Sequence, residues 1–298
     1  MSDITLLDGG IGQEIVARAG DKPTPLWSTQ AMVDHPGVVK DVHLDYFHAG
    51  STIATTNTYA IHRDRLENNG MAAHFDALLE AALNEATEAR ASFGSGQIVG
   101  SIGPLGASYR PDLMPPHQTA VVQFREVAER LAPRVDILAG ETVTSLAHAD
   151  AVLEAASGLG RPVWLAVTLS DDDGTILRSG EKVADLGSII AKHEPAAVLA
   201  NCSVPEVMKA GLTELAKFGL PFGAYANGFR RITEGFLAAN PTVDALEARD
   251  DLDPAAYADF VFEWIDMGAT LVGGCCETGP AHIAEIARRL HASGHRTV

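Results

Sequence analysis

The sequence predicts a single-domain α/β protein with the TIM (β/α)8 barrel fold, spanning residues 1–298. Three observations favour this fold. The length suits one barrel, short apolar runs alternate eight times with helical periodicity, and polar residues gather at one end of those runs. A doubly wound open sheet is the alternative, but its usual strand count is lower.

The predicted strands are nearly continuous apolar runs, as expected for parallel strands covered on both faces. They are Ile4–Asp8, Ser51–Thr56, Gln97–Ile102, Val135–Gly140, Pro162–Thr168, Ala196–Asn201, Phe222–Tyr225 and Thr270–Gly274.

A helical pattern follows each predicted strand. Glycines come after several of these helices and prolines open three of them, in agreement with the residue preferences of helix ends. The predicted helices are Val38–His48, Phe75–Ser92, Thr119–Leu131, Ser145–Ala156, Lys182–Lys192, Pro205–Phe218, Pro254–Met267 and Pro280–Leu290.

Composition narrows the choice of partners and location. The chain has 22 basic and 39 acidic side chains, a net charge of -17 that repels phosphate backbones and anionic lipid. We therefore expect no nucleic acid and no membrane as partners, whereas the outer helices leave room for a homo-oligomer. The sequence shows neither a signal peptide nor a long apolar run, which favours the cytoplasm. An odd number of only three cysteines argues against a disulfide framework and for free thiols.

The carboxyl ends of the predicted strands carry the polar groups, and this rim is where TIM barrels place their active sites. Three long stretches without clear periodicity lie on the same rim and are candidates for lids or substrate loops, and the last of them could instead form an interface. They are Gly20–Gln30, Ala107–His117 and Gly228–Asp253. The run Asp171–Gly174 resembles part of a calcium loop but lacks the later ligands, so we expect a solvated turn there.

All three cysteines lie at this rim. Cys275 and Cys276 end one predicted strand and Cys202 ends another that is its near neighbour in a ring of eight. Three thiolates with one open position form a catalytic type of zinc site. The alternative is that these residues are small buried hydrophobic side chains.

A zinc ion held by three thiolates carries excess negative charge, which makes hydrolysis by bound water less natural. A substrate thiol suits such a site better, because zinc keeps it as a nucleophilic thiolate at neutral pH. The cysteine pattern therefore favours the alkylation of a thiol.

The sequence resembles the homocysteine S-methyltransferase family. The motifs that carry the resemblance run through almost the whole chain in the family's order. They are Leu7-Asp8-Gly9-Gly10, Pro25-Leu26-Trp27-Ser28, His43 to Gly50, Thr56-Asn57-Thr58-Tyr59, Gly103-Pro104, Glu141-Thr142, Cys202, and Gly273-Gly274-Cys275-Cys276 with Thr278, Pro280, His282 and Ile283.

The resemblance implies a zinc-dependent TIM barrel that transfers a methyl group to homocysteine and forms methionine. It implies that Cys202, Cys275 and Cys276 bind zinc. It also implies that the homocysteine head is held by Asp8, Gly9, Gly10 and Glu141, where carboxylates suit the ammonium and bare glycine amides can approach the carboxylate.

Trp27, Asn57 and Tyr59 are candidates for the methyl donor pocket, since aromatic faces can bind a methylated cation. Simple packing under the loops is the alternative for the aromatic residues. Val143 after the Glu-Thr pair makes the chain similar to the branch that uses S-methylmethionine or S-adenosylmethionine. The short loop Gly106–Asp112 and Glu277 depart from that branch. We predict a sulfonium donor, with betaine or another methylated onium compound as the alternative.

Two other classes of function stay open. One is a barrel that binds zinc and a thiol amino acid without turning it over. The other is a zinc hydrolase, which the lack of histidine and carboxylate ligands at matching strand ends disfavours.

Overall fold

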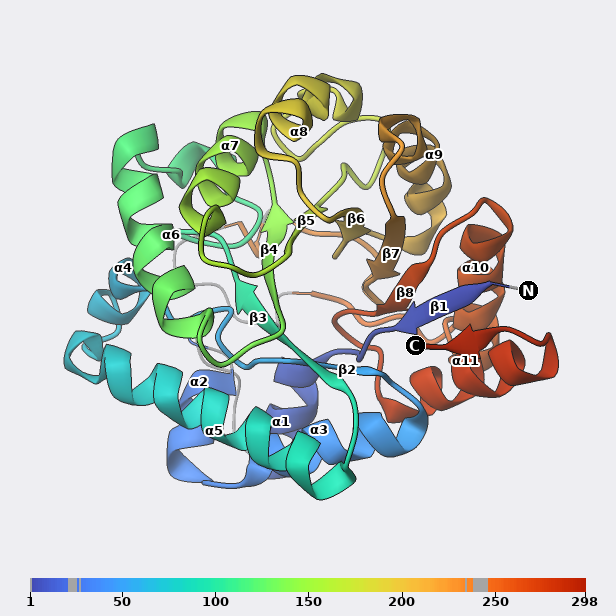
Figure 1. The fold of residues 1–298 in the computed structure, drawn as a ribbon, viewed down its shortest axis with the longest axis horizontal. Coiled ribbons are helices and arrows are strands. Elements are labelled where there is room, and N and C mark those ends of the chain that lie inside the picture. The colour runs from blue at the N-terminus through green and yellow to red at the C-terminus, as the bar shows by residue number, and fades with distance from the viewer. Residues whose placement is uncertain (1, 21–25, 27, 234, 238–245) are drawn as a thin grey trace.

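The structure is a computed structural model that describes residues 2–20, 26, 28–233, 235–237 and 246–298. Within these residues nine parallel strands form one curled sheet in the order β2-β3-β4-β5-β6-β7-β8-β1-β9, with helices around its outside (Figure 1). The strands are β1 (Asp3–Leu6), β2 (Ile53–Thr55), β3 (Gln97–Ile102), β4 (Ile137–Val143), β5 (Val163–Val167), β6 (Ala197–Asn201), β7 (Phe222–Ala226), β8 (Leu271–Gly274) and β9 (Arg296–Thr297).

All eight predicted strands are confirmed, and β9 is an addition that pairs with β1 through Asp3 and Arg296. The eight predicted helices are confirmed too, although α8 begins with a 3-10 turn. The α-helices are α1 (Ile11–Ala19), α2 (Ser28–Asp34), α3 (Val38–Ala49), α4 (Arg63–Glu67), α5 (Phe75–Phe93), α6 (His117–Leu131), α7 (Leu146–Ala156), α8 (Gly187–His193), α9 (Pro205–Leu215), α10 (Pro254–Asp266) and α11 (Pro280–Ala292), and the 3-10 helices are η1 (Ala72–His74), η2 (Pro111–Leu113), η3 (Val183–Leu186) and η4 (Ala216–Phe218). Sequence reasoning missed α1, α2 and α4.

The sheet separates two apolar layers, because successive residues of a strand point to opposite faces. In β5, Trp164 and Ala166 belong to the layer enclosed by the sheet, whereas Leu165 and Val167 belong to the larger layer under the helices. Both faces are covered, which explains why the strands read as continuous apolar runs.

The prediction of a barrel is supported as far as a curled parallel sheet. Ladders join neighbouring strands from β2 around to β1, and β1 pairs with β8 at Thr5 and Leu6. In the described chain β1 and β2 are linked without a ladder, by a hydrogen bond of 2.8 Å from the Thr52 amide to the Leu6 carbonyl.

Helix ends follow the sequence signals. Gly50 and Gly94 end α3 and α5 with φ angles of 107° and 94°, which favour glycine. Ser145 and Asp253 cap α7 and α10 by accepting hydrogen bonds from backbone amides. These caps start the helices where the polar rim of the sheet ends.

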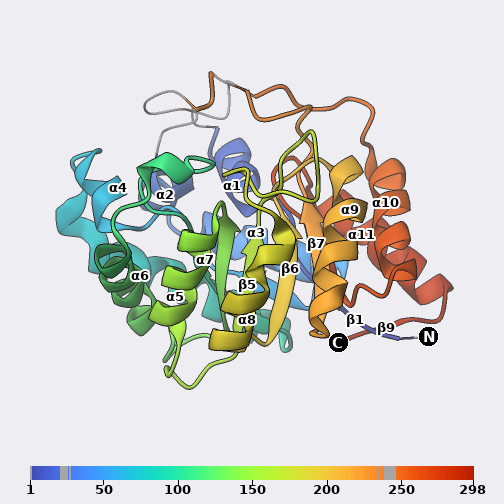
Figure 2. The same cartoon turned by 90° about the horizontal axis from the view of Figure 1, so that it is seen from above.

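The described part of the segment after β7 runs across the top of the molecule in Figure 2, above the carboxyl ends of the strands. Part of this segment, residues 234 and 238–245, lies outside the described residues. The two termini lie close together at the opposite, amino end of the sheet. Among the described helices, none combines the length and the apolar character needed to cross a membrane.

Candidate active site

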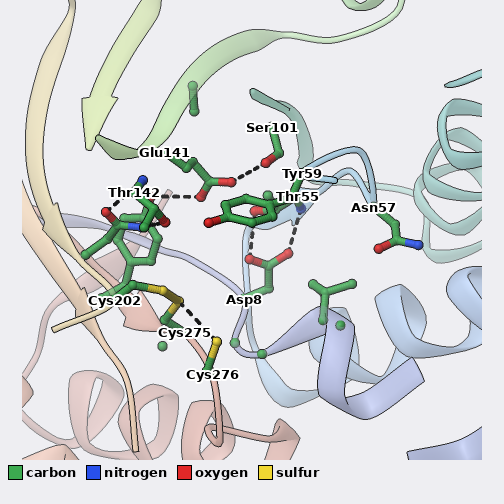
Figure 3. A pocket seen from close by; sticks show the side chains of 18 of the residues that line it. Asp8, Thr55, Asn57, Tyr59, Ser101, Glu141, Thr142, Cys202, Cys275 and Cys276 are labelled. Carbon is green, nitrogen blue, oxygen red and sulfur yellow. Dashed lines mark hydrogen bonds between the residues drawn. A yellow bond between two sulfur atoms is a disulfide. The ribbon is translucent and has the colours of Figure 1, made fainter. Parts of the chain in front are cut away.

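One cavity at the carboxyl ends of the strands collects the predicted site residues (Figure 3). Every predicted site residue that the structure describes lines it, whereas Trp27 lies outside the described residues. The lining residues already predicted are Asp8, Gly9, Gly10, Asn57, Tyr59, Glu141, Cys202, Cys275 and Cys276. The topology therefore brings together residues from both ends of the sequence.

The three cysteines form one cluster at the ends of β6 and β8. Their sulfur atoms all lie within 4.8 Å of one another, and the sulfurs of Cys275 and Cys276 are 4.0 Å apart. Cys202 and Cys275 form a disulfide, with 5.8 Å between their Cα atoms. The expectation of three free thiols is thus wrong for this state, because the two strand ends bring these side chains within bonding reach. Cys276 is a buried free thiol.

Backbone packing holds the cysteines in place. The Cys202 amide donates to the Tyr225 carbonyl at 3.1 Å and the Cys275 amide to the Ala226 carbonyl at 2.9 Å, so both flank β7. A Cβ atom on Gly274 would collide with the Thr278 side chain, whose hydroxyl donates to the Cys275 carbonyl at 2.6 Å. Gly274 therefore lets the next loop close tightly against the cysteines, whereas Gly273 leaves room for Leu7 and Asp8 after β1.

Burial raises the pKa of the Cys276 thiol to about 12. A bound metal must consequently displace a proton from this thiol. Three converging soft sulfur donors, once the disulfide is reduced, fit a zinc ion better than a hard cation such as magnesium.

Asp8 lies just after β1 and its carboxylate is fixed by Thr55 of β2. The Thr55 amide donates at 2.6 Å to one oxygen and the Thr55 hydroxyl at 2.8 Å to the other. Burial raises the pKa of Asp8 from 3.8 to about 7, the Thr55 hydrogen bonds oppose this rise, and the charge of Glu141 adds to it. The cavity therefore contains a carboxyl group that is only partly ionised near pH 7.

Glu141 comes from β4 and lines the same cavity as Asp8 and Tyr59 (Figure 3). The Tyr225 hydroxyl donates to it at 2.8 Å and the Ser101 hydroxyl donates to its second oxygen. Burial raises the pKa of Glu141, and these two hydrogen bonds oppose that rise. The described residues that line the cavity include these two carboxylates and no lysine or arginine, which suits a ligand that brings its own positive charge.

Gly9 and Gly10 line the cavity after Asp8, but the Gly10 amide does not have the role predicted for it. The Gly10 amide donates to the Thr278 carbonyl at 2.9 Å, so it is already occupied. A Cβ atom on Gly9 would collide with that same carbonyl. These glycines let β1 and the loop after β8 approach each other, and they lead into α1, whose first residues Ile11 and Gly12 also line the cavity.

Asn57 lines the cavity but turns toward α2. It accepts a hydrogen bond from the Ser28 hydroxyl, and its amide approaches the Ser28 carbonyl at 3.4 Å. In Figure 3 it lies apart from the two carboxylates. Its visible contacts position the start of α2.

Positive φ angles concentrate at this site. Five non-glycine residues in the described chain have them, and three of those, Tyr109, Thr142 and Cys202, line the cavity at φ angles of 61°, 53° and 48°. A fourth, Glu277, directly follows Cys276. Such backbone conformations cost free energy and persist where the surrounding structure imposes them, commonly at functional sites.

Sequence reasoning missed several groups that complete the site. Thr55, Ser101 and Tyr225 hold the two carboxylates, and Tyr109 closes one wall of the cavity. A usable signal existed for two of them, because Thr55 and Ser101 are polar residues inside otherwise apolar strands. Nothing in the spacing of the sequence marks Tyr225 or Tyr109.

Comparison with known proteins agrees with this site. The model of the homocysteine S-methyltransferase family matches residues 5–290. The chain is 30% identical to the homocysteine S-methyltransferase of Escherichia coli (strain K12), covering 96% of this chain and 95% of that protein. It is 28% identical to homocysteine S-methyltransferase YbgG of Bacillus subtilis (strain 168), covering 95% and 93%.

Two crystal structures of the Escherichia coli homocysteine methyltransferase MmuM are similar to this fold. The metallated form superposes with a TM-score of 0.80 and the oxidized form with 0.82, each at 28% identity and covering 97% of this chain and 96% of that chain. The prediction of a metal site agrees with the metallated neighbour and with the three-sulfur cluster. The family match along nearly the whole chain, together with 30% identity to a full-length relative, means that this protein belongs to the homocysteine S-methyltransferase family.

Proposed function

We propose that the protein transfers a methyl group from a sulfonium donor, S-methylmethionine or S-adenosylmethionine, to the sulfur of homocysteine and so forms methionine. One observation carries this proposal. The cavity joins a cluster of three cysteines to two buried carboxylates, the groups needed to hold a thiol and an amino acid head in one substrate.

Cys202, Cys275 and Cys276 would hold a zinc ion after reduction of the disulfide. When bound, zinc would lower the pKa of a substrate thiol and keep its sulfur nucleophilic at neutral pH. The requirement for reduced thiols supports the cytoplasm as the proposed location.

Asp8 and Glu141 would bind the ammonium group of homocysteine. Asp8 must be ionised for this, and the incoming positive charge favours the ionised form. The carboxylate of homocysteine would lie at the amino end of α1, where Ile11 and Gly12 line the cavity and the helix dipole favours a negative group. This assignment replaces the role first expected for the Gly10 amide.

The charge of the cavity supports a cationic donor. Among the described lining residues there are two carboxylates and no lysine or arginine. In the transfer, the homocysteine sulfur forms a bond to the methyl carbon while the donor's bond to that carbon breaks and its electron pair stays on the leaving sulfur. The leaving group is neutral, so the protein supplies alignment and exclusion of water and no general base.

Methionine formation tests the proposal directly. We would incubate the reduced, zinc-loaded protein with homocysteine and, separately, S-methylmethionine, S-adenosylmethionine or glycine betaine. Methionine from a sulfonium donor is expected, whereas activity with betaine alone would replace the sulfonium by a quaternary ammonium donor. Cys275→Ser should lose both zinc and activity, and a variant that kept both would contradict the role of the cluster. A zinc-replete sample inactive with every donor would favour a binding protein.

We also propose that the sheet closes into a complete eight-stranded barrel, with β9 outside the ring. The Thr52 to Leu6 hydrogen bond supports this closure. Slow hydrogen exchange of the Thr52 amide, comparable with amides inside the ladders, is expected for a closed barrel.

A further inference from the structure

The loop after β3, Gly106–Asp112, has no part in the zinc and homocysteine sites described above. Its Tyr109 is only 5% exposed and lines the cavity together with Cys202 and Cys276. Its φ angle of 61° is a conformation that a bulky residue adopts rarely. The backbone conformation that places this ring at the cavity wall is therefore unfavourable in free energy and must be held by the surrounding structure.

Contacts from two other rim loops fix the ring. The guanidinium carbon of Arg178 lies 5.2 Å from the ring centroid, and the ring of Phe236 meets it edge-on at 5.9 Å. Arg178 makes two hydrogen bonds to Asp171, of 2.8 and 2.6 Å, and Asp171 also accepts the Ile232 amide at 2.9 Å. The loops after β3, β5 and β7 therefore meet at Tyr109.

The expectation of a solvated turn over Asp171–Gly174 holds for Asp172 and Asp173, which are exposed, but not for the Asp171 side chain. The side chains of Asp171 and Arg178 are 6% and 12% exposed. A buried bidentate pair of this kind holds a fixed geometry, because leaving either charge unpaired would be costly. Its negative member also neutralises the guanidinium that lies against the ring.

The surroundings of Tyr109 combine sulfur and apolar groups, of which the two cysteines also line the cavity. It belongs to one apolar cluster with Cys202, Cys276, Phe229 and Phe236. A donor whose methyl group approaches a sulfur nucleophile at the cysteine cluster therefore comes within the region that Tyr109 walls. The hydroxyl of Tyr59 is 2.9 Å from that of Ser108, the residue before Tyr109.

We propose that Tyr109 is a specificity-determining residue for the methyl donor. Its ring forms the wall that receives the positively charged sulfur of the donor, and the Arg178–Asp171 pair is a positioning device for that ring. The inference rests on the proposed function and adds the residue that selects a cationic donor. A ring face attracts a cation electrostatically, an attraction that an uncharged ligand of the same shape does not share.

The decisive experiment therefore compares a ligand that carries a sulfonium charge with an isostere that lacks that charge. The charged ligand is S-methylmethionine, and the isostere is 2-amino-5-methylhexanoic acid, in which a CH group replaces the sulfonium sulfur. We would measure the KM of S-methylmethionine, the inhibition constant of the isostere and the KM of homocysteine for each variant.

Tyr109→Leu removes the ring and should raise the KM of S-methylmethionine about tenfold. The inhibition constant of the isostere and the KM of homocysteine should change by less than about twofold, since neither depends on attraction of a cation to the ring. Tyr109→Phe keeps the ring and should restore discrimination between the two ligands. Equal weakening of both ligands, or no change in either, would overturn the inference.

Arg178→Gln should impair the same discrimination and Arg178→Lys should partly restore it. Phe229→Leu is the matched control, because Phe229 belongs to the same cluster but is not among the residues that line the cavity. It should lower Tm and leave the ratio of the two ligands unchanged. If Tyr109→Leu fails to fold, Tyr109→Met replaces it in the same comparison.

Failure of the proposed function gives a different result. If the unmodified protein forms no methionine from any donor, the proposed reaction is wrong, and binding of S-methylmethionine and the isostere still tests Tyr109 by calorimetry. The same comparison of Tyr109→Leu with the unmodified protein is made with glycine betaine as the donor. A loss in Tyr109→Leu for betaine but not for S-methylmethionine would assign the ring to ammonium donors and overturn the sulfonium assignment.

Discussion

Replacing Asp8 by asparagine should stabilise the protein at alkaline pH while weakening homocysteine binding. In the folded protein the pKa of Asp8 is raised from 3.8 to about 7, chiefly by burial. The folded state thus holds a proton between these values that the unfolded state releases. The contribution to stability is complete below pH 3.8 and is lost as the pH rises toward 7.

The rise in pKa corresponds to about 4 kcal/mol in the free energy of unfolding. Asparagine avoids the buried charge and can still accept from the Thr55 amide through its oxygen while donating to the Thr55 hydroxyl through its nitrogen. The difference in unfolding free energy between Asp8→Asn and the unmodified protein should therefore grow by about 1.4 kcal/mol per pH unit up to pH 7 and level off above it.

Urea denaturation of the metal-free, reduced proteins from pH 5.5 to 8.5 measures this difference, which should increase by about 2 kcal/mol over that range. Calorimetry at pH 8 should show homocysteine binding weakened about ten- to hundredfold through loss of a charged hydrogen-bond partner. Asp172→Asn is the control, since that side chain is 81% exposed and its replacement removes no buried charge. A flat difference for Asp8→Asn, or a loss of stability at pH 8, would refute the reasoning.

Three further outcomes are expected. Glu141→Gln should raise the KM of homocysteine about tenfold through loss of one charge facing the ammonium, with zinc content by mass spectrometry unchanged; a loss of zinc would mean that Glu141 supports the metal site. Gly9→Ala should lower the free energy of unfolding by about 1–3 kcal/mol because its Cβ would meet the Thr278 carbonyl, and an unchanged denaturation midpoint would contradict this packing. Zinc affinity should fall by more than about tenfold for each unit of decreasing pH, because binding must release the proton of Cys276, whose pKa burial raises to about 12, together with those of the two other reduced thiols. Competition with a chelator from pH 6.5 to 8.5 measures this, and a constant affinity would oppose it.

The sequence predicted the strands well because burial on both faces leaves an unbroken apolar run. The same physics explains the omissions. β9 consists of Arg296 and Thr297, which carry no apolar pattern. Helix α4 has five residues, too few to show a helical period, and α1 follows directly on the glycines of the Asp8 motif.

The sequence predicted those site residues that belong to a recognisable motif. It did not predict those that reach the site only because folding brings distant parts of the chain into contact. Asp8, Glu141 and the cysteines stand at strand ends in a recognisable order. Tyr225 reaches Glu141 across 84 positions of sequence, and the Cys202–Cys275 disulfide spans 73. Contacts of that kind depend on strand order and register, which apolar periodicity does not encode.

The pairing of β1 with β9 has an engineering consequence. It places both ends of the chain side by side at the amino end of the sheet, where the Ser2 hydroxyl lies 3.0 Å from His295 Nδ1, away from the cavity. A short linker could therefore join the ends, and new ends could open at the exposed turn around Gly158 and Gly160, which precedes β5 on that same side. Circular permutation at this turn should preserve every rim loop, so the molecule can be carried within a longer fusion with its active site unobstructed.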